Sequence, residues 1–320
     1  MSKISGTQVA VGLGIESAAA PGTAVAETVF IPWLDYSIQA VAEKAFFAPA
    51  RGVRNMVVNS MIKRKYAQGS IAFVPDVKVM PYFLSLALGS VSSSGVSDSA
   101  YTHTFTVNND NATPRTATLT TEEGGIQTTQ YTNMVCNSLD LEVSDEYAKA
   151  TAELIGQFPG TDTISESYST ETEFAYHQYT AKFGTSLSNA AGNSAAPLKS
   201  FKLNINNSVL LDEAFLSGSN GITSGNLVNG KLEITGSYSL HFTDTTELNK
   251  YKNNTKNALI VTFEGALLGS ASRETIQLKF GQLVLTNPPV EYNIDGLAVL
   301  NQAFTVEYDA TVAELTAVVI

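Results

Sequence analysis

Residues 232–242 read Leu232-Glu-Ile-Thr-Gly-Ser-Tyr-Ser-Leu-His-Phe242, and this stretch decides the fold class. Its large apolar side chains occupy every second position, which is the pattern of a β-strand with one buried face. Asp244 follows, and Glu247 stands three residues later, a spacing typical of a capping box in the first turn of a helix. We therefore expect a half-buried antiparallel strand followed directly by a short helix over 244–254.

A second stretch has the same order of features. Gly69-Ser-Ile-Ala-Phe-Val-Pro-Asp76 also alternates and also ends at an aspartate. The segment 76–88 that follows has Pro81 early and Gly89 immediately after it, which favours a short helix that begins near the proline and ends at the glycine. We interpret the two strand–helix pairs as copies of one module, with chance similarity as the alternative.

Alternation with a period of two recurs along most of the chain. Further examples are 139–143, 201–205, 276–280 and 304–308. Turn signals separate these runs, among them Gly124-Gly125, Asn229-Gly230 and Asn287-Pro288-Pro289. The sequence therefore predicts a mainly β fold, an antiparallel β-sandwich or barrel with short flanking helices.

The Ser/Ala/Asn/Gly-rich segment 186–197 has no periodicity and is the best candidate for a linker. It divides the chain into an N-terminal module, 1–195, which begins with an extended arm, and a C-terminal module, 196–320. We expect two similar modules in tandem.

Two other segments carry more apolar side chains than a solvated loop needs. The segment 207–229 includes Leu210 and Leu211, and we expect it to contact another subunit. The tail 311–320 is almost wholly apolar after Glu314, so we expect it to pack onto a neighbouring surface or to join a sheet edge.

The composition favours association with protein neighbours over binding to phosphate. Hydrophobic residues make up 44% of the 320 residues and charged residues only 15%, so much of the surface is polar but uncharged and can be buried at low desolvation cost. The net charge of −11 disfavours nucleic-acid binding as the main activity, because that affinity comes from Lys and Arg.

The single cysteine, Cys136, excludes an intrachain disulfide, and we expect it to be a small buried hydrophobe in a strand. No stretch reaches the ~20 apolar residues of a membrane-spanning helix. The segment 9–26 imitates a secretory signal, but Glu16 and Pro21 interrupt it, so we interpret it as an extended arm of a protein assembled in the cytoplasm.

The usual marks of enzyme chemistry are missing from the sequence. It contains no Gly-x-Ser-x-Gly elbow, His-Glu-x-x-His or phosphate-binding Gly-Lys-Ser/Thr loop, and the Gly12-x-Gly14 pair lacks a third glycine. The histidines are scattered, at His103, His177 and His241. Acidic pairs stand beside turns, at Glu122-Glu123, Asp145-Glu146 and Asp212-Glu213, and 108–111 is a weak calcium candidate. We predict no catalytic, cofactor-binding or metal-binding residues.

A basic cluster, Lys63-Arg64-Lys65, has Arg51 and Arg54 a short distance upstream. Such a cluster can touch DNA. Because the rest of the chain has an excess of acidic residues, we favour pairing with acidic residues of an adjacent subunit.

Dispersed positions along nearly the whole chain resemble the siphophage tail tube protein family. The similar stretches are Gly14-Ile-Glu-Ser17, Pro21-Gly-Thr-Ala-Val-Ala26, Phe30-Ile-Pro32, Arg51-Gly52, Gly69-Ser-Ile71, Ala87-Leu-Gly89, His103-Thr-Phe-Thr106, Val135-Cys-Asn-Ser-Leu-Asp-Leu141, Lys199-Ser-Phe-Lys-Leu-Asn-Ile-Asn206 and the strand at Gly236. They are small and apolar residues and do not form a functional signature.

The resemblance implies sandwich or barrel-like tube modules, each with a flanking helix, and a non-enzymatic subunit of a bacteriophage tail. Such subunits polymerise as stacked rings around a channel through which DNA passes without specific binding. A tape measure protein and a tail terminator are the further partners that it implies, and the location is the virion.

Two other classes of protein remain open at this point. One is a different structural β-subunit, of the surface-layer, fimbrial or baseplate type, and the other is a carbohydrate-acting enzyme on a β-sandwich. For a tube subunit, two modules per chain favour a ring of three chains with pseudo-six-fold symmetry, with a true hexamer as the alternative.

Overall fold

The structure is a computed structural model, and it is mainly β, with 57% strand and 11% helix. It describes residues 5–48, 57, 59–95, 100–109, 113–143, 146–164, 166–169, 173–215, 219, 221–223, 225–241, 245–268, 272–287, 290–291, 298–309 and 313–320. Among these residues the strands form a large antiparallel network and no closed barrel, so the predicted mainly β class is confirmed.

The first half of the chain contains eleven strands and one α-helix in the described residues. They are β1 (Val9–Ile15), β2 (Val29–Phe30), β3 (Trp33–Tyr36), β4 (Gln39–Phe47), β5 (Asn59–Phe73), α1 (Met80–Leu88), β6 (Gly89–Gly95), β7 (Tyr101–Val107), β8 (Ala117–Glu123), β9 (Gln127–Val143), β10 (Ala148–Gly156) and β11 (Gly160–Thr161).

The second half adds eight strands and two α-helices to the described residues. They are β12 (Tyr179–Gly184), α2 (Leu187–Gly192), β13 (Leu198–Asn206), β14 (Glu233–His241), α3 (Thr246–Lys252), β15 (Asn257–Leu268), β16 (Ser272–Leu285), β17 (Val290–Glu291), β18 (Val299–Val306) and β19 (Leu315–Val319).

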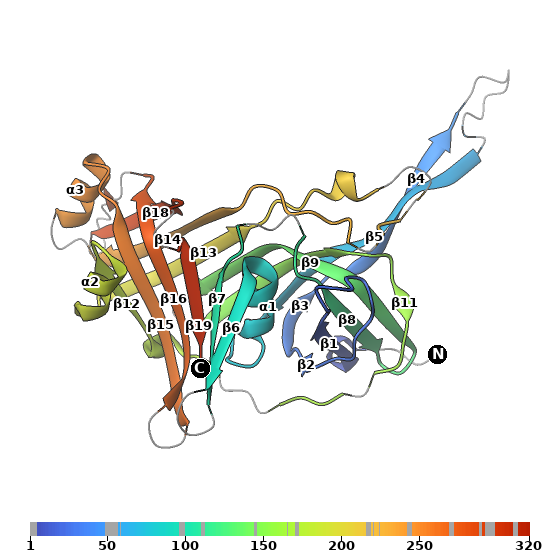
Figure 1. Ribbon diagram of the computed structural model, residues 1–320, viewed down its shortest axis with the longest axis horizontal. Coiled ribbons are helices and arrows are strands. Elements are labelled where there is room, and N and C mark those ends of the chain that lie inside the picture. The colour runs from blue at the N-terminus through green and yellow to red at the C-terminus, as the bar shows by residue number, and fades with distance from the viewer. Residues whose placement is uncertain are drawn as a thin grey trace.

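The long strand β9 belongs to two sheets. Its first part pairs with β8, which continues to β1 and β2, and its second part pairs with β10 on one side and β13 on the other. The second part thereby completes a sheet in the order β4–β5–β10–β9–β13–β14–β18, which runs along the length of the molecule (Figure 1). β9 joins the two halves of the chain by main-chain hydrogen bonds.

β16 has a similar double membership in the second half. Its last residues pair with β18, and its first part lies between β15 and β19. This second sheet continues to β12 on one side and to β7 and β6 on the other. Rings of Phe201, Tyr238, Phe280 and Phe304 pack together in the core of this half, with ring centroids 5.8 to 6.4 Å apart.

The pairing of β5 with β3 and β4 recurs between β14 and β13 in the same register. Both pairings contain an irregularity at the same level, and the β4–β5 pairing has a second one between Glu43 and Lys44. The partners beside it are Trp33↔Phe73 and Asp35↔Ala72 in the first half, and Leu198↔Leu240 and Ser200↔Ser239 in the second.

The pairs Gly69-Ser70 and Gly236-Ser237 occupy equivalent positions in these two strand pairings. A Cβ atom added to Gly69 would lie 2.5 Å from the carbonyl oxygen of Ser37, and one added to Gly236 would lie 2.4 Å from that of Lys202. Ser37 and Lys202 occupy corresponding positions, because each lies opposite the serine that follows the glycine. Both glycines are therefore required by the same close approach of the neighbouring strand.

The hairpin of β8 and β9 corresponds in the same way to the hairpin of β15 and β16. Each hairpin has a register shift at the same level, and the β15–β16 hairpin has a second one between Glu264 and Leu267. The partners beside the shift are Ala117↔Met134 and Leu119↔Tyr131 in the first half, and Asn257↔Leu283 and Leu259↔Phe280 in the second. The outer neighbours also correspond, because β1 lies beside β8 and β12 lies beside β15.

Both predicted helices are present where the sequence placed them. α1 begins one residue before Pro81 and ends at Gly89, whose φ of 86° only glycine adopts readily. The carboxylate of Asp76 accepts hydrogen bonds from the backbone amides of Lys78 and Val79 just before this helix. α3 lies within the predicted 244–254, and Asp244 itself lies outside the described residues.

We expected 186–197 to be a linker without regular structure, but the structure shows a helix there. The segment contains α2, whose first turn is capped by Ser186 Oγ accepting a hydrogen bond from the Asn189 amide at 3.2 Å. Ala190 packs against Ala258 and Ile260 of β15, so the segment is part of the folded body. A six-residue helix shows too little periodicity to be recognised in a run of small residues.

The C-terminal tail, which we expected to pack onto a neighbouring surface or to join a sheet edge, forms a strand of the sheet. Its strand β19 lies between β16 and β7 of the same chain, and Leu315, Ala317 and Val319 are at most 1% exposed. The tail is apolar because it is an interior strand, and it links the second half of the chain to the β6–β7 hairpin of the first half.

Replacing Ala317 by Asp should lower the free energy of unfolding by at least about 3 kcal/mol, because an unpaired charge would be buried between β16 and β7. Thr316→Asp, half-buried on the opposite face, is the control and should cost less than about 1 kcal/mol. Chemical denaturation of both variants measures the difference. Equal stability of the Ala317 variant and the wild type would show that β19 is dispensable.

Cys136 is fully buried in β9, as predicted, and burial raises the pKa of its thiol to about 12. Because the thiolate is the reactive species, we expect no alkylation by iodoacetamide in the native protein at pH 8 and full alkylation in denaturant. Mass spectrometry counts the adducts. Rapid alkylation under native conditions would contradict this placement.

Candidate self-assembly surfaces

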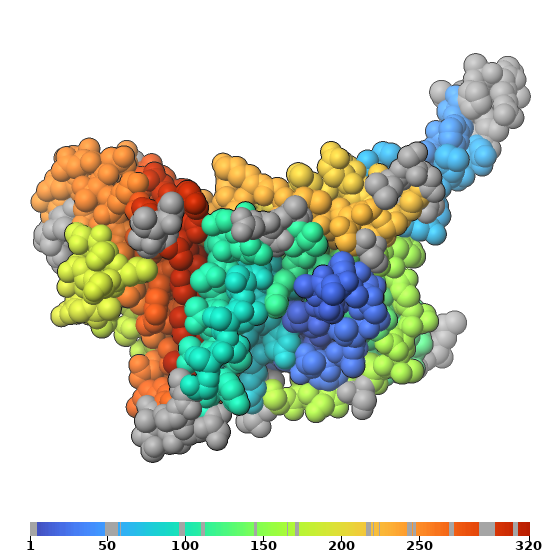
Figure 2. Space-filling view, in the orientation of Figure 1, coloured from blue at the N-terminus to red at the C-terminus, as the bar shows by residue number. Residues whose placement is uncertain are grey.

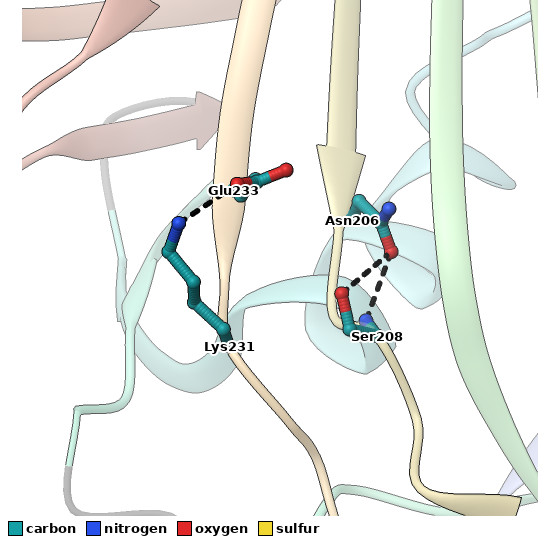
Figure 3. Close-up of polar contacts among 4 residues, drawn as sticks. All are labelled: Asn206, Ser208, Lys231 and Glu233. Atoms are coloured by element: carbon teal, nitrogen blue, oxygen red, sulfur yellow. Dashed lines mark hydrogen bonds and ion pairs between the residues drawn. The ribbon is translucent and has the colours of Figure 1, made fainter.

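The loop 207–230 leaves β13 through a tight local turn. Asn206 Oδ1 accepts hydrogen bonds from the amide and the hydroxyl of Ser208, at 2.9 and 3.4 Å, and Ser208 has a φ of 47° (Figure 3). Where the chain returns to β14, Lys231 pairs with Glu233 at 2.8 Å, and this hydrogen bond lowers the pKa of the Glu233 carboxyl. A local polar contact therefore stands at each end of the loop.

We expected the apolar residues of this loop to contact another subunit, but most of those described are covered within the chain. Ala214, Ile222 and Leu227 form a small buried cluster with Tyr66 and Val135 of the first half. Val209, Leu211 and Phe215 pack around this cluster, whereas Leu210 is 44% exposed. The loop therefore fastens the second half of the chain onto β5 and β9.

The basic cluster is largely engaged within the chain. Arg64 pairs with Asp212 of the loop at 2.5 Å, and its guanidinium lies over the Phe215 ring. The ammonium of Lys65 lies over the Phe158 ring, while Lys63 is exposed. The acidic partner that we expected from an adjacent subunit is supplied by the other half of the same chain, and Arg51 and Arg54 lie outside the described residues.

The hairpin of β4 and β5 projects beyond the body of the molecule (Figures 1 and 2). Large apolar side chains are exposed along it. They are Phe46, Phe47, Met61 and Ile62, exposed by 65, 44, 55 and 39%. Apolar side chains gathered on a projecting element mark an interaction site in a protein that remains soluble. The sign of this site in the sequence is the pair of adjacent aromatic residues Phe46-Phe47, which breaks the alternation of the strand.

The carboxylate of Glu16 organises the segment after β1. It is 5% exposed and accepts four hydrogen bonds, two from the amides of Gly22 and Asn133 and two from the hydroxyls of Thr116 and Thr118. These four donors satisfy a carboxylate whose burial without hydrogen bonds would be costly. Glu16 thus ties the N-terminal arm to β8 and β9, a role that its neighbours in sequence do not reveal.

The candidates for chemistry stay apart in the structure. Among the described residues no three His, Cys, Asp or Glu side chains gather as a metal site would require. His103 Nδ1 lies 2.8 Å from Ser93 Oγ, and Asn109 donates to Glu314 at 3.3 Å. Asp110, Asn111 and Asp145 lie outside the described residues. The arrangement supplies hydrogen bonds within strands and loops.

A cavity of about 470 Å³ lies between β2, α1 and β7. Its described lining includes Lys78, His103 and Arg115 but no carboxylate. A glycosidase needs two carboxylates facing one cleft. This cavity therefore does not support the carbohydrate-acting alternative.

Comparison with known proteins gives one clear result. A family model described as phage tail tube protein matches residues 6–307, which is nearly the whole chain. The search of curated proteins finds no match. None of the described helices is long and apolar enough to cross a membrane.

Leu227 lies on the buried surface of the loop and Leu210 on its exposed surface, so the two can be tested separately. Leu227→Asp should lower the free energy of unfolding by at least about 3 kcal/mol, because Leu227 is 1% exposed in the cluster against Tyr66. Leu210→Asp, at an exposed position of the same loop, should change it by less than about 0.5 kcal/mol. Urea denaturation followed by circular dichroism tests both values. A stable Leu227 variant would refute docking of the loop.

Proposed function

The chain belongs to the phage tail tube protein family, and from this premise we propose that it polymerises as stacked rings around a channel for DNA. Membership gives it a structural role in the tail of the virion. The observation that carries the proposal further is the repeated strand register, because it provides each chain with two similar building blocks. Surface-layer, fimbrial and enzymatic functions have no comparable support.

The two blocks are proposed to be tandem tube modules. The sequence placed them at 1–195 and 196–320, but the matching pairs begin with β1 in the first half and with β12 in the second. We therefore place the start of the second module before Tyr179. The matched order β4–β5–β10–β9 and β13–β14–β18–β16 supports two copies of one fold better than chance similarity of two short motifs.

A ring of three chains follows from two modules per chain, if the modules occupy equivalent places around the channel. The junction between modules inside the chain is a continuous sheet through β9 and β13. A ring closes when the same kind of junction also joins neighbouring chains. Three chains then supply six modules, whereas a hexamer of this chain would supply twelve.

The projecting β4–β5 hairpin is proposed to contact subunits outside its own ring. It extends beyond the sheet that would join neighbours within a ring, and its exposed apolar side chains need cover in the assembled tail (Figure 2). The net charge of −11 favours passage of DNA, because an acidic channel wall repels phosphate. A tape measure protein and a tail terminator complete the set of partners proposed for the tube.

Replacing Phe46 and Met61 together by Ser should abolish or strongly reduce tubes while the free energy of unfolding changes by less than about 1 kcal/mol, because both side chains are exposed in the single chain. Negative-stain electron microscopy of wild type and variant at equal concentration measures tube formation.

Ile126→Ser, which removes an apolar side chain 63% exposed at the β8–β9 turn, is the matched control and should leave tubes intact. Tubes of normal length from the Phe46/Met61 variant would remove the hairpin from the assembly interface. A wild-type protein that stays a compact monomer at high concentration would contradict the tube function itself.

A further inference from the structure

The long sheet has two outer edges that lack a strand partner within the described residues. One is the edge of β3 and β4 that faces away from β5, and the other is the edge of β17 that faces away from β18. Figure 1 shows β4 at one end of the long axis and β18 at the other. Unpaired edges of a structural protein are sites where another chain can add.

The pairing of β13 with β9 inside the chain shows how two such edges can join. Between the halves, β13 pairs with β9 in an antiparallel register that places Lys202 opposite Glu142 and Leu203 opposite Leu141. The Lys202 ammonium and the Glu142 carboxylate form an ion pair at 2.6 Å on the exposed face. Leu203 and Leu141 are both at most 3% exposed on the other face.

The recurring register identifies the residues that correspond to this joint. One row of partners crosses the first half and an equivalent row crosses the second. The rows are Trp33–Phe73–Ala150–Leu141 and Leu198–Leu240–Leu300–Val290. Val290 therefore stands where Leu141 stands, and Glu291 stands where Glu142 stands.

The other side of the joint is fixed by the same rows. Trp33 corresponds to Leu198, and an irregularity follows each of them directly. Ser37 therefore corresponds to Lys202 and Ile38 to Leu203. Ile38 is 4% exposed, as Leu203 is 3% exposed, and Ser37 lies on the exposed face, as Lys202 does. The match in burial supports the match in register.

We propose that β17 of one chain pairs antiparallel with β3–β4 of the next chain, with Glu291 opposite Ser37 and Val290 opposite Ile38. The inference rests on the proposed ring and names the surface that closes it, with a second copy of this chain as the partner. The joint between chains repeats the joint within the chain, except that Ser37 replaces the lysine of the internal ion pair. One continuous sheet then passes through all chains of the ring.

A register-specific crosslink tests this pairing in assembled tubes. Directly opposite residues of antiparallel strands have Cα atoms about 4.5–5.5 Å apart, which a disulfide can span. The double variant Ser37→Cys/Glu291→Cys should form disulfides between chains after mild oxidation, seen as a ladder on non-reducing gels. Native Cys136 is buried and does not compete.

The mismatched control is Val41→Cys/Glu291→Cys. It moves one thiol four residues along β4, on the same face of the strand, which is about 13 Å. This variant should lose the crosslink. Lys202→Cys/Glu142→Cys is the positive control, because these two residues are paired within one chain and should crosslink without forming a ladder.

A mixture of the single variants Ser37→Cys and Glu291→Cys replaces the double variant if the latter does not assemble, and it should give crosslinked dimers. Matched crosslinking without mismatched crosslinking supports the joint, and a ladder that ends at three chains supports the trimer. Tubes that form without the matched crosslink, or that crosslink equally at Val41, overturn the joint and leave the tube function standing. A wild-type protein that forms no rings or tubes overturns both.

Discussion

The antiparallel pairing of β9 with β13 is the interaction on which the rest of the structure depends. β9 pairs with β8 in one sheet and with β10 and β13 in the other, so a single strand carries hydrogen bonds to both halves of the chain. Its buried face includes Leu139, Leu141 and Val143, which lie in the main core. Two further contacts join the halves: the loop 207–230 packs onto β5 and β9, and β19 pairs with β7. Without this pairing, the two halves would each expose a long sheet edge.

The fold class and the two strand–helix units were predictable from local patterns. Alternation around Gly69 and Gly236 and the proline and glycine near α1 are determined by neighbouring residues, and short-range physics decides them. The match between Trp33 and Leu198 was not predictable in this way, because it depends on partners about forty residues away in each half. The one local sign of this match is the Gly-Ser dipeptide in each half. The backbone of Ser37 or Lys202 approaches the glycine too closely for a side chain at Gly69 or Gly236.

The errors share one physical cause. We expected Leu211 and Arg64 to contact other subunits, and the tail 311–320 to pack onto a neighbouring surface or to join a sheet edge, because each carries apolar or charged groups that need a partner. Composition shows that such residues need a partner, but it does not show whether the partner lies in the same chain. Here the partner lies in the same chain, as Asp212 does for Arg64. Glu16 was missed for the opposite reason, because its four donors come from three separate segments.

The covalent link between the halves changes the kinetics of assembly. Two modules on one chain meet at an effective concentration set by the connecting segment, in the millimolar range for short links, rather than at the concentration of subunits in the infected cell. In the proposed ring, half of the joints are therefore made during folding. Of the three joints that remain, two need bimolecular encounters and the third forms when the ring closes. The β6–β7 hairpin follows α1, whereas β15 follows α3 directly in the described residues, so the two halves present different surfaces at this point.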